Sequence, residues 1–313
     1  MASLFAAVEL APRDPILGLN EQFNADTNPA KVNLGVGVYF DENGKLPLLA
    51  CVKAAEALMM EAPKARNYLP IDGIAAYDSA VQDLVFGADH PIRKAGRIAT
   101  IQAVGGTGAL KVGADFLKRM NPAATVLISD PSWENHRALF EGAGFKVATY
   151  PYYDAKARDV DVQGMLAALD AAAPGTVVVL HACCHNPTGY DIAAQDWPRI
   201  IEIVRARNLV AFLDLAYQGF GDGIAEDGAV VRMCLEAGID FFVATSFSKS
   251  FSLYGERVGA LSVVCASKDE AGRVLSQLKR VIRANYSNPP THGARVVTTV
   301  LGTPALRATW EKE

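Results

Sequence analysis

Three side chains capable of acid–base or nucleophilic chemistry follow short apolar runs of the sequence. Asp214 comes directly after the run 210–213, and Tyr217 lies three residues further on. Lys249 lies four residues beyond the run 241–245. Each residue by itself is more often a loop or capping residue. In open α/β sheets, however, ligands bind beyond the carboxyl ends of strands, so we expect these side chains to converge on one crevice.

Other polar and aromatic residues sit at the ends of further predicted strands. They are Trp133, His136, His181, Asn186, Ser246 and Arg257, together with a glycine turn at residues 105–108. The turn opens a helix, whose free N–H groups favour a phosphate. It lacks the third glycine of a dinucleotide fingerprint, which argues against a nicotinamide-dependent dehydrogenase. An amine, a carboxylate, a phenol, an aromatic face and a phosphate cradle together match the demands of pyridoxal phosphate.

A metal site is the alternative for the segment that holds His181, Cys183, Cys184 and His185. Imidazole and thiolate are the ligands that zinc prefers. Adjacent residues of an extended segment point to opposite faces, which keeps them out of one ligand sphere. We therefore predict no metal in this protein.

The elements that position these residues alternate between strand and helix. Such alternation predicts a mostly parallel sheet covered on both faces by helices, a three-layer α/β/α domain. The first ninety residues differ, because their sequence is turn-rich and predicts irregular structure. The predicted strands are 97–103, 125–129, 146–150, 177–181, 210–213, 241–245 and 259–266, and the predicted helices are 109–120, 134–142, 196–207, 229–237 and 268–284.

Composition limits the classes of function. The 313 residues include 30 basic and 34 acidic side chains, a net charge of −4 that predicts no nucleic-acid partner. The sequence shows no signal peptide and no apolar run long enough to span a membrane. Its five cysteines are an odd number and widely spread, which is no disulfide framework. We therefore expect a cytoplasmic protein that acts on small molecules.

Several motifs in series resemble the class I aminotransferases of the aspartate/aromatic amino-acid type, which are fold type I pyridoxal-phosphate enzymes. They include NLGVGVY (33–39), NYLPIDG (67–73), GGTGAL (105–110), SDPSWENH (129–136), HACCHNPTG (181–189), LDLAYQGFGDG (213–223), SFSKSFSLYGERVGAL (246–261) and RANYSNPPTHGA (283–294). The resemblance implies an aspartate aminotransferase-like fold. It also implies pyridoxal-phosphate-dependent transamination between an amino acid and a 2-oxo acid by a ping-pong mechanism.

The resemblance also implies a role for each matching residue. Lys249 forms the Schiff base and moves the proton, and Asp214 faces the pyridine nitrogen. Their supporting residues are Asn186 and Tyr217 at the phenolic oxygen, Trp133 against the ring, His136 and His181 behind Asp214, and Arg257, Ser246, Gly106 and Thr107 at the phosphate. Across a homodimer interface, Tyr68 reaches the partner's phosphate and Arg283 binds the distal carboxylate of the substrate, while Val36 and Gly37 lie over the substrate. Aspartate, glutamate, 2-oxoglutarate and oxaloacetate are the expected substrates, with aromatic amino acids as the alternative.

By the same resemblance, the chain divides into an arm at 1–13, the start of a small domain at 14–45, a cofactor-binding large domain at 46–305 and the beginning of a connecting helix at 306–313. Family members continue beyond this point, so we expect the small domain to be incomplete and the arginine for the substrate's α-carboxylate to be absent. A chain that binds the cofactor without turnover is therefore the alternative function. A pyridoxal-dependent lyase or decarboxylase is a further one, which Arg283 disfavours.

Overall fold

The computed structural model describes residues 3–11, 17–33, 35, 37–63 and 65–313. It divides the chain into two compact units, Met1–Pro47 and Leu48–Glu313. The first unit contains one helix in its described part, α1 (Leu17–Ala25). Lys31 stabilises the end of this helix, because its Nζ donates to the carbonyl oxygens of Phe23 and Asp26, each at 2.6 Å.

The second unit contains a seven-stranded sheet with the strand order β1-β9-β8-β7-β6-β2-β3. Five neighbouring strands, from β8 through β3, run parallel, and only β9 is antiparallel to its neighbours β1 and β8 in the described sheet. The strands are β1 (Ile98–Val104), β2 (Thr125–Asp130), β3 (Lys146–Pro151), β6 (Val177–His181), β7 (Val210–Leu215), β8 (Phe241–Ser246) and β9 (Val258–Val264); a separate hairpin consists of β4 (Tyr153–Asp154) and β5 (Asp159–Val160).

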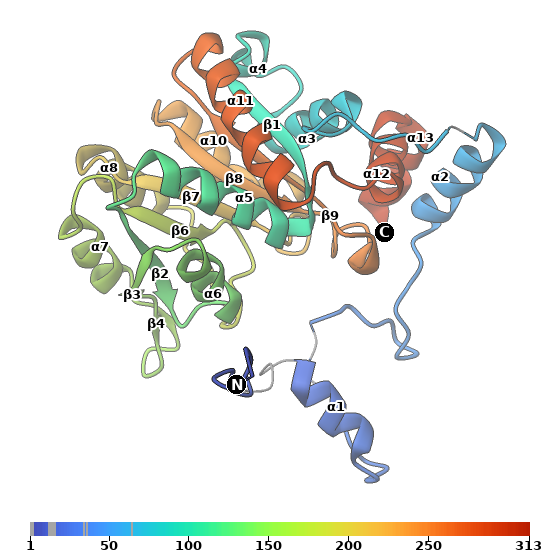
Figure 1. Cartoon of the computed structure of the whole chain (residues 1–313), viewed down its shortest axis with the longest axis horizontal. Coiled ribbons are helices and arrows are strands. Elements are labelled where there is room, and N and C mark those ends of the chain that lie inside the picture. Colours follow the sequence, from blue (N-terminus) through green and yellow to red (C-terminus); the bar gives the residue numbers. More distant parts are fainter. Residues whose placement is uncertain (1–2, 12–16, 34, 36, 64) are drawn as a thin grey trace. The chain divides into compact units, whose positions relative to one another are not determined.

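Helices cover both faces of this sheet (Figure 1). Side chains of each strand alternate between two apolar cores, as successive residues of a strand must. On β6, Val178 and Leu180 enter the core beneath α2, α3, α8, α10 and α12, whereas Val177 and Val179 enter the core beneath α5, α6 and α11. The predicted three-layer α/β/α architecture with a mostly parallel sheet is confirmed.

The helices of this unit include several that the sequence analysis did not predict. Residues 50–61 and 75–86, which lie in the stretch predicted as irregular, form α2 and α3. Both helices bury one face in the core, including Cys51, Val52 and Tyr77, so tertiary packing outweighs their turn-rich flanks. The helices are α2 (Ala50–Glu61), α3 (Ala75–Phe86), α4 (Pro91–Lys94), α5 (Gly105–Met120), α6 (Glu134–Gly142), α7 (Val162–Asp170), α8 (Trp197–Ala206), α9 (Ile224–Asp227), α10 (Ala229–Glu236), α11 (Lys268–Asn285), α12 (His292–Gly302) and α13 (Pro304–Lys312), with a 3₁₀ turn, η1, at Tyr254–Glu256.

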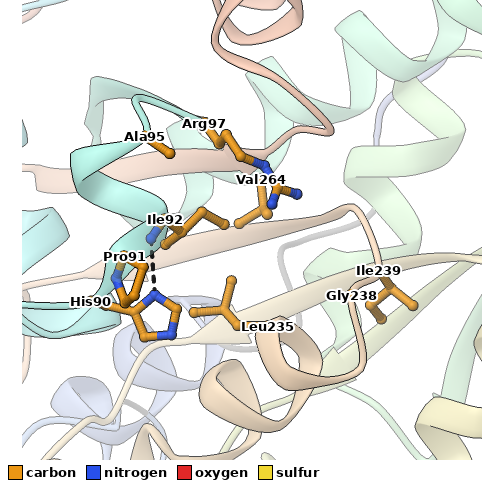
Figure 2. Close-up of a pocket in the computed structure, with 9 residues that line it drawn as sticks. All are labelled: His90, Pro91, Ile92, Ala95, Arg97, Leu235, Gly238, Ile239 and Val264. Carbon is orange, nitrogen blue, oxygen red and sulfur yellow. Dashed lines mark hydrogen bonds between the residues drawn. The ribbon is translucent and has the colours of Figure 1, made fainter.

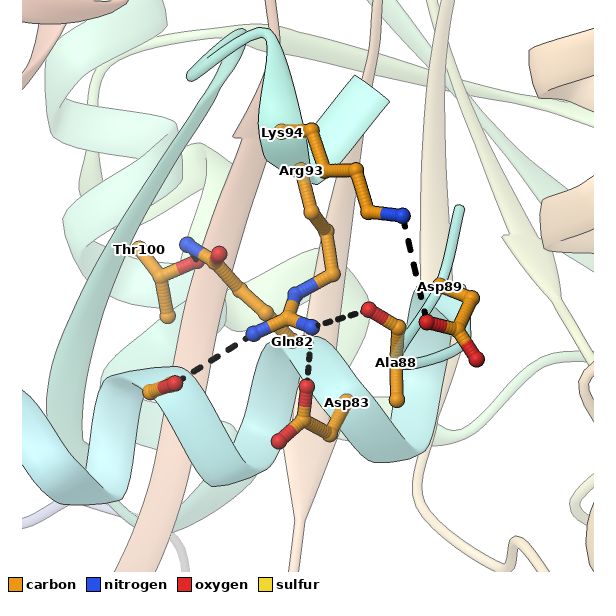
Figure 3. Close-up of polar contacts among 8 residues, drawn as sticks. Gln82, Asp83, Ala88, Asp89, Arg93, Lys94 and Thr100 are labelled. Carbon is orange, nitrogen blue, oxygen red and sulfur yellow. Dashed lines mark hydrogen bonds and ion pairs between the residues drawn. The ribbon is translucent and has the colours of Figure 1, made fainter. Parts of the chain in front are cut away.

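Polar contacts join α3 to the short helix α4 ahead of the first strand (Figure 3). Arg93 forms an ion pair with Asp83 and donates to the carbonyl oxygen of Ala88 at 2.7 Å. Lys94 makes a longer ion pair with Asp89, at 3.9 Å. These contacts fix the approach to β1, whose far end leads into the glycine turn. Within the described residues, every helix is too short or too polar to cross a membrane.

Candidate active site

The residues predicted to do chemistry gather where the parallel strands end. In the sheet, His181 at the end of β6 lies opposite Asp214 on β7, and Asp214 lies opposite Ala244 on β8. Lys249 follows β8 by three residues. The imidazole, the carboxylate and the amine stand at or just after the ends of the neighbouring strands β6, β7 and β8. Because parallel strands end on the same edge of a sheet, the three groups lie along one edge.

Asp214 is a buried carboxylate with one oxygen bonded and the other without a partner. Its Oδ2 lies 2.8 Å from Nε2 of His136, and Nδ1 of the same imidazole lies 3.0 Å from the Ser132 hydroxyl. Its Oδ1 has no hydrogen-bond partner among the described residues. Burial tends to raise the pKa of Asp214. The His136 hydrogen bond and the neighbouring positive charges outweigh burial, so the net pKa lies below its usual value and the carboxylate stays ionised.

His181 lies between two other imidazoles and lacks polar contacts. Its ring centroid is 4.9 Å from that of His136 and 4.3 Å from that of His185, and neither of its nitrogens has a partner among the described residues. Burial lowers the pKa of His181 to about 3, with the charge of His136 contributing further. His181 is therefore neutral at physiological pH and packs against the His136–Asp214 pair.

Lys249 extends over the face of Tyr217, with its Nζ 4.6 Å from the ring centroid. Burial lowers the pKa of Lys249 below its usual value; the charge of Asp214 opposes this shift and that of Arg257 adds to it. Tyr217 hydrogen-bonds Asn186, and burial raises the pKa of its phenol. An amine whose pKa is lowered is easier to deprotonate than an ordinary lysine, which suits it to attack a carbonyl group.

The glycine turn brings backbone close to Arg257. Helix α5 begins at Gly105, four residues earlier than predicted, so the turn itself forms its first turn. Gly105 has φ +69°, and a Cβ there would lie 2.4 Å from Nη2 of Arg257. A Cβ on Gly106 would lie 3.0 Å from Cβ of Ser246. The helix N-terminus, with Thr107, therefore meets a guanidinium group and a hydroxyl, which is a donor set suited to a phosphate.

These residues fit pyridoxal phosphate. The unpartnered Oδ1 of Asp214 offers a buried negative charge to a protonated ring nitrogen, and Lys249 offers an amine from the segment that follows the neighbouring strand β8. Trp133, at the N-cap of α6, packs edge-on against His136 with ring centroids 5.2 Å apart, so it borders the same carboxylate. The amine, the anion, the aromatic ring and the phosphate donors thus belong to one unit of the fold.

Two sequence-predicted residues of the second unit are not brought into this group. Tyr68 is 92% exposed, and Arg283 is exposed on α11 with its guanidinium on the Ser287 hydroxyl. Gly37 belongs to the first compact unit, which the structure describes by itself. The neighbouring Val36, also predicted to cover the substrate, lies outside the described residues.

Trp310 supports the lysine segment and was missed by the sequence analysis. Its indole donates to the carbonyl oxygen of Ser250 at 2.6 Å, next to Lys249, and its ring stacks on Phe251 with centroids 4.7 Å apart. Sixty residues separate these partners, and no motif joins them, so only the fold reveals the contact. Ser132, which lies four residues before His136, was within reach of a helical-spacing argument.

A cavity of about 200 Å³ lies at the other end of the sheet (Figure 2). Its lining includes His90, Arg97 and Ile239, and Ile239 precedes β8 whereas Lys249 follows it. None of the sequence-predicted site residues lines this cavity. The strand-end group is therefore the better candidate for catalysis.

The chain matches known proteins over almost its full length. Residues 29–313 match the family model for aminotransferase class I and II. An aspartate aminotransferase of Pseudomonas aeruginosa is 64% identical over 99% of this chain and 78% of its own length, and a tyrosine aminotransferase of Klebsiella pneumoniae is 51% identical over the same shares. The crystal structure of an aromatic-amino-acid aminotransferase from Burkholderia pseudomallei, covalently bound to pyridoxal phosphate, is 66% identical with a TM-score of 0.97 over 99% of this chain and 78% of that one. The chain therefore belongs to the class I and II aminotransferases and is itself an aminotransferase.

Proposed function

We propose that this aminotransferase, whose cofactor is pyridoxal phosphate, binds that cofactor covalently through Lys249 and transfers amino groups in two half-reactions. The observation that carries the proposal is the pairing of Lys249 with Asp214. The amine has a lowered pKa, and the buried carboxylate keeps one oxygen without a partner on the adjacent strand. Amino acids and 2-oxo acids are the substrates of the family.

When bound, pyridoxal phosphate supplies an aldehyde that condenses with amines and a protonated ring that withdraws electrons from the substrate's α-carbon. Asp214 holds the proton on the ring nitrogen, because its carboxylate stays ionised and His136 occupies its other oxygen. The His181 ring packs against that of His136, and the Ser132 hydroxyl hydrogen-bonds the His136 ring and orients it.

Lys249 supplies the amine for the covalent bond and then acts as general base. With the cofactor and a substrate bound, its Nζ would be the group placed to accept and return the proton of the substrate's α-carbon. Its lowered pKa makes the neutral form easier to reach than in an ordinary lysine. Tyr217 and Asn186, which hydrogen-bond each other, hold the phenolic oxygen of the cofactor.

The remaining donors hold and orient the cofactor. Arg257 clamps the phosphate, as the fork of its guanidinium group permits two parallel hydrogen bonds. Its Nη1 is already directed by the carbonyl oxygen of Tyr254, at 2.9 Å. Ser246, Gly106 and Thr107 add donors from the strand end and the helix N-terminus, and Trp133 covers one face of the ring.

Substrate selection rests on residues that a second copy of the chain would bring into place. Tyr68 and Arg283 are both exposed, and in a homodimer they complete the partner's phosphate and substrate sites. Arg283 binds the distal carboxylate of aspartate, glutamate, oxaloacetate or 2-oxoglutarate, with aromatic amino acids as the alternative donors. In domain terms, 14–45 belongs to the small domain, 46–305 is the cofactor-binding domain and 306–313 begins the connecting helix.

Borohydride trapping followed by peptide mapping tests the covalent assignment. The purified chain is loaded with pyridoxal phosphate and reduced, and the modified peptide is identified by mass spectrometry. We expect the adduct on Lys249, its loss in Lys249→Ala, and its retention in Lys279→Ala, where the lysine is paired with Asp72 on the surface of α11. An adduct on another lysine of the wild-type chain refutes the assignment.

The visible absorption spectrum of the loaded chain then tests the reaction. Conversion of the bound-aldehyde band to the amine form by aspartate or glutamate, reversed by 2-oxoglutarate, supports two half-reactions. A band that ignores both amino acids supports a cofactor-binding chain without turnover. Release of ammonia or carbon dioxide marks a lyase or a decarboxylase and contradicts transamination.

A further inference from the structure

Two thiols and a carboxylate form a cluster that the transamination chemistry does not use. The Sγ atoms of Cys183 and Cys184 and one carboxylate oxygen of Asp227 all lie within 4.8 Å of one another. Cys183 follows β6 by two residues, and Asp227 ends the short helix α9. The other group with such spacing in the described residues, His136, His181 and Asp214, belongs to the cofactor site.

The backbone at Cys184 explains how adjacent cysteines present their sulfurs together. The sequence analysis assumed an extended segment, in which neighbouring side chains point apart. Cys184 instead has φ +50°, in the left-handed region. Both carboxylate oxygens of Asp191 hold this turn, accepting the N–H groups of Cys184 at 2.6 Å and His185 at 2.7 Å. The assumption was therefore wrong at this residue, and the argument against a shared ligand sphere fails there.

The two thiols are chemically coupled as well as adjacent. They hydrogen-bond each other, which raises the pKa of Cys183 and lowers the pKa of Cys184. Cys184 is partly exposed, whereas Cys183 is buried, so an ion can reach the pair from the Cys184 side.

Asp227 is held in place as a ligand before anything binds. It is only 5% exposed, and its Oδ2 accepts the N–H groups of Gly219 at 2.7 Å and Gly221 at 3.0 Å. Its Oδ1 accepts one N–H, from Asp222 at 3.0 Å, which leaves that oxygen a second acceptor position. A carboxylate fixed by three backbone donors loses little freedom when it coordinates an ion.

The charge around the cluster favours a cation. The carboxylates of Asp191, Asp222 and Asp227 all act on the Cys184 thiol. Ligand atoms bound to one tetrahedral Zn²⁺ at about 2.0–2.3 Å lie about 3.3–3.8 Å apart, so the three atoms need only small movements to share an ion. We propose that Cys183, Cys184 and Asp227 bind a thiophilic divalent cation of the Zn²⁺ or Cd²⁺ class, with the fourth position open to solvent.

An ion at this cluster would act on the cofactor site. Cys184 lies two residues before Asn186, which hydrogen-bonds Tyr217, and the charge on Cys184 also acts on Tyr217. Coordination would draw the 183–186 turn toward Asp227 and move Asn186 with it. The inference is independent of the transamination proposal, since binding of the ion requires no turnover.

Equilibrium dialysis of the pyridoxal-phosphate-loaded chain against Cd²⁺ tests the proposal, with the thiols kept reduced by a phosphine. We expect one Cd²⁺ per chain. Cys184→Ser should weaken binding by more than the about 10- to 100-fold that loss of an outer-shell contact costs. Asp222→Asn removes a neighbouring charge without removing a ligand, so it should weaken binding less than Cys184→Ser does. Cys265→Ser removes a distant thiol and should bind as the wild type does.

A second measurement needs no variant. Cd²⁺ should slow alkylation of Cys184 by iodoacetamide in the wild-type chain, as followed by mass spectrometry, and removal of the ion by a chelator should restore it. The proposal is overturned if Cys184→Ser keeps wild-type affinity for Cd²⁺. It is equally overturned if saturating Cd²⁺ leaves the alkylation rate of Cys184 unchanged.

Discussion

Replacement of His136 by phenylalanine isolates the interaction that keeps Asp214 ionised. The imidazole is fully buried, its Nε2 lies 2.8 Å from Oδ2 of Asp214, and its ring packs between Trp133 and His181. Phenylalanine keeps a ring in this space but has no donor. Because Oδ1 of Asp214 already lacks a partner, the variant leaves both oxygens of a buried carboxylate without hydrogen bonds.

The expected cost follows from the loss of a hydrogen bond to a charged group. Such a bond contributes about 1.5–3 kcal/mol, and removing one partner leaves the other buried and unsatisfied. At about 1.4 kcal/mol per pKa unit, the pKa of Asp214 in the folded chain should rise by about one to two units. Without the His136 hydrogen bond, the effect of burial, which raises the pKa of Asp214, would outweigh the remaining effects that lower it.

The sign of the pH dependence distinguishes this effect from a packing defect. In the wild type the folded pKa lies below the reference value of 3.8, so Asp214 contributes stability that is present above that value and lost as pH falls through the folded pKa. In the variant the folded pKa is raised, so the carboxyl contributes stability below the reference value and loses it as pH rises through the new pKa. The gap in unfolding free energy between the two chains should therefore be about 1.5–3 kcal/mol at pH 7 and narrow toward pH 4.

Urea unfolding of the full chain without added cofactor, at several pH values, measures this gap. His136→Gln, whose amide can donate to Asp214, should recover part of the loss. Ser132→Ala removes only the outer bond to His136 and should change stability less than either variant. A gap that is constant with pH would show that packing rather than charge determines the loss, and the reasoning about Asp214 would be refuted.

Two further substitutions test how the fold supports the site. Trp310→Phe keeps an aromatic ring behind the lysine segment but leaves the Ser250 carbonyl oxygen without its donor. We expect urea unfolding to show a free energy of unfolding lower by about 1–3 kcal/mol, and the pH titration of the bound cofactor's absorbance to shift. An unshifted titration would mean that Trp310 does not position Lys249. Gly113→Ala places a Cβ 2.5 Å from Phe212 and should lower the free energy of unfolding by about 1–3 kcal/mol. The control is Gly142→Ala, whose Cβ would meet nothing within 4 Å and which should leave the free energy of unfolding nearly unchanged. Equal effects of the two substitutions in urea unfolding would contradict the packing argument.

The sheet was predictable because its strands carry a local signal. Val177–His181 was predicted with its observed bounds, and β7 extends only two residues beyond the predicted 210–213. Buried parallel strands read as continuous apolar runs, whatever surrounds them. Helix α2 is rich in strong helix formers but is bounded by turn-rich segments, so a prediction made for the whole N-terminal stretch passed over it.

The site was predictable to the extent that it follows strand ends. Asp214 and Lys249 were predicted to lie together because parallel strands place their carboxyl ends on one edge of a sheet. The contact of Trp310 with the lysine segment depends on how α13 packs, which no spacing encodes. The exposure of Tyr68 and Arg283 likewise depends on tertiary position.

The segment after β6 shows where the alternation rule stops applying. Within β6, Val178 and Val179 enter opposite cores, as the pleat requires. The last strand residue is His181. Three residues later, at Cys184, the backbone is in a left-handed turn that Asp191 holds by accepting the Cys184 N–H. A rule based on strand geometry is valid only as far as the ladder of hydrogen bonds extends. Functional groups beyond strand ends lie just outside that range, so their mutual arrangement has to be read from the loop's own hydrogen bonds.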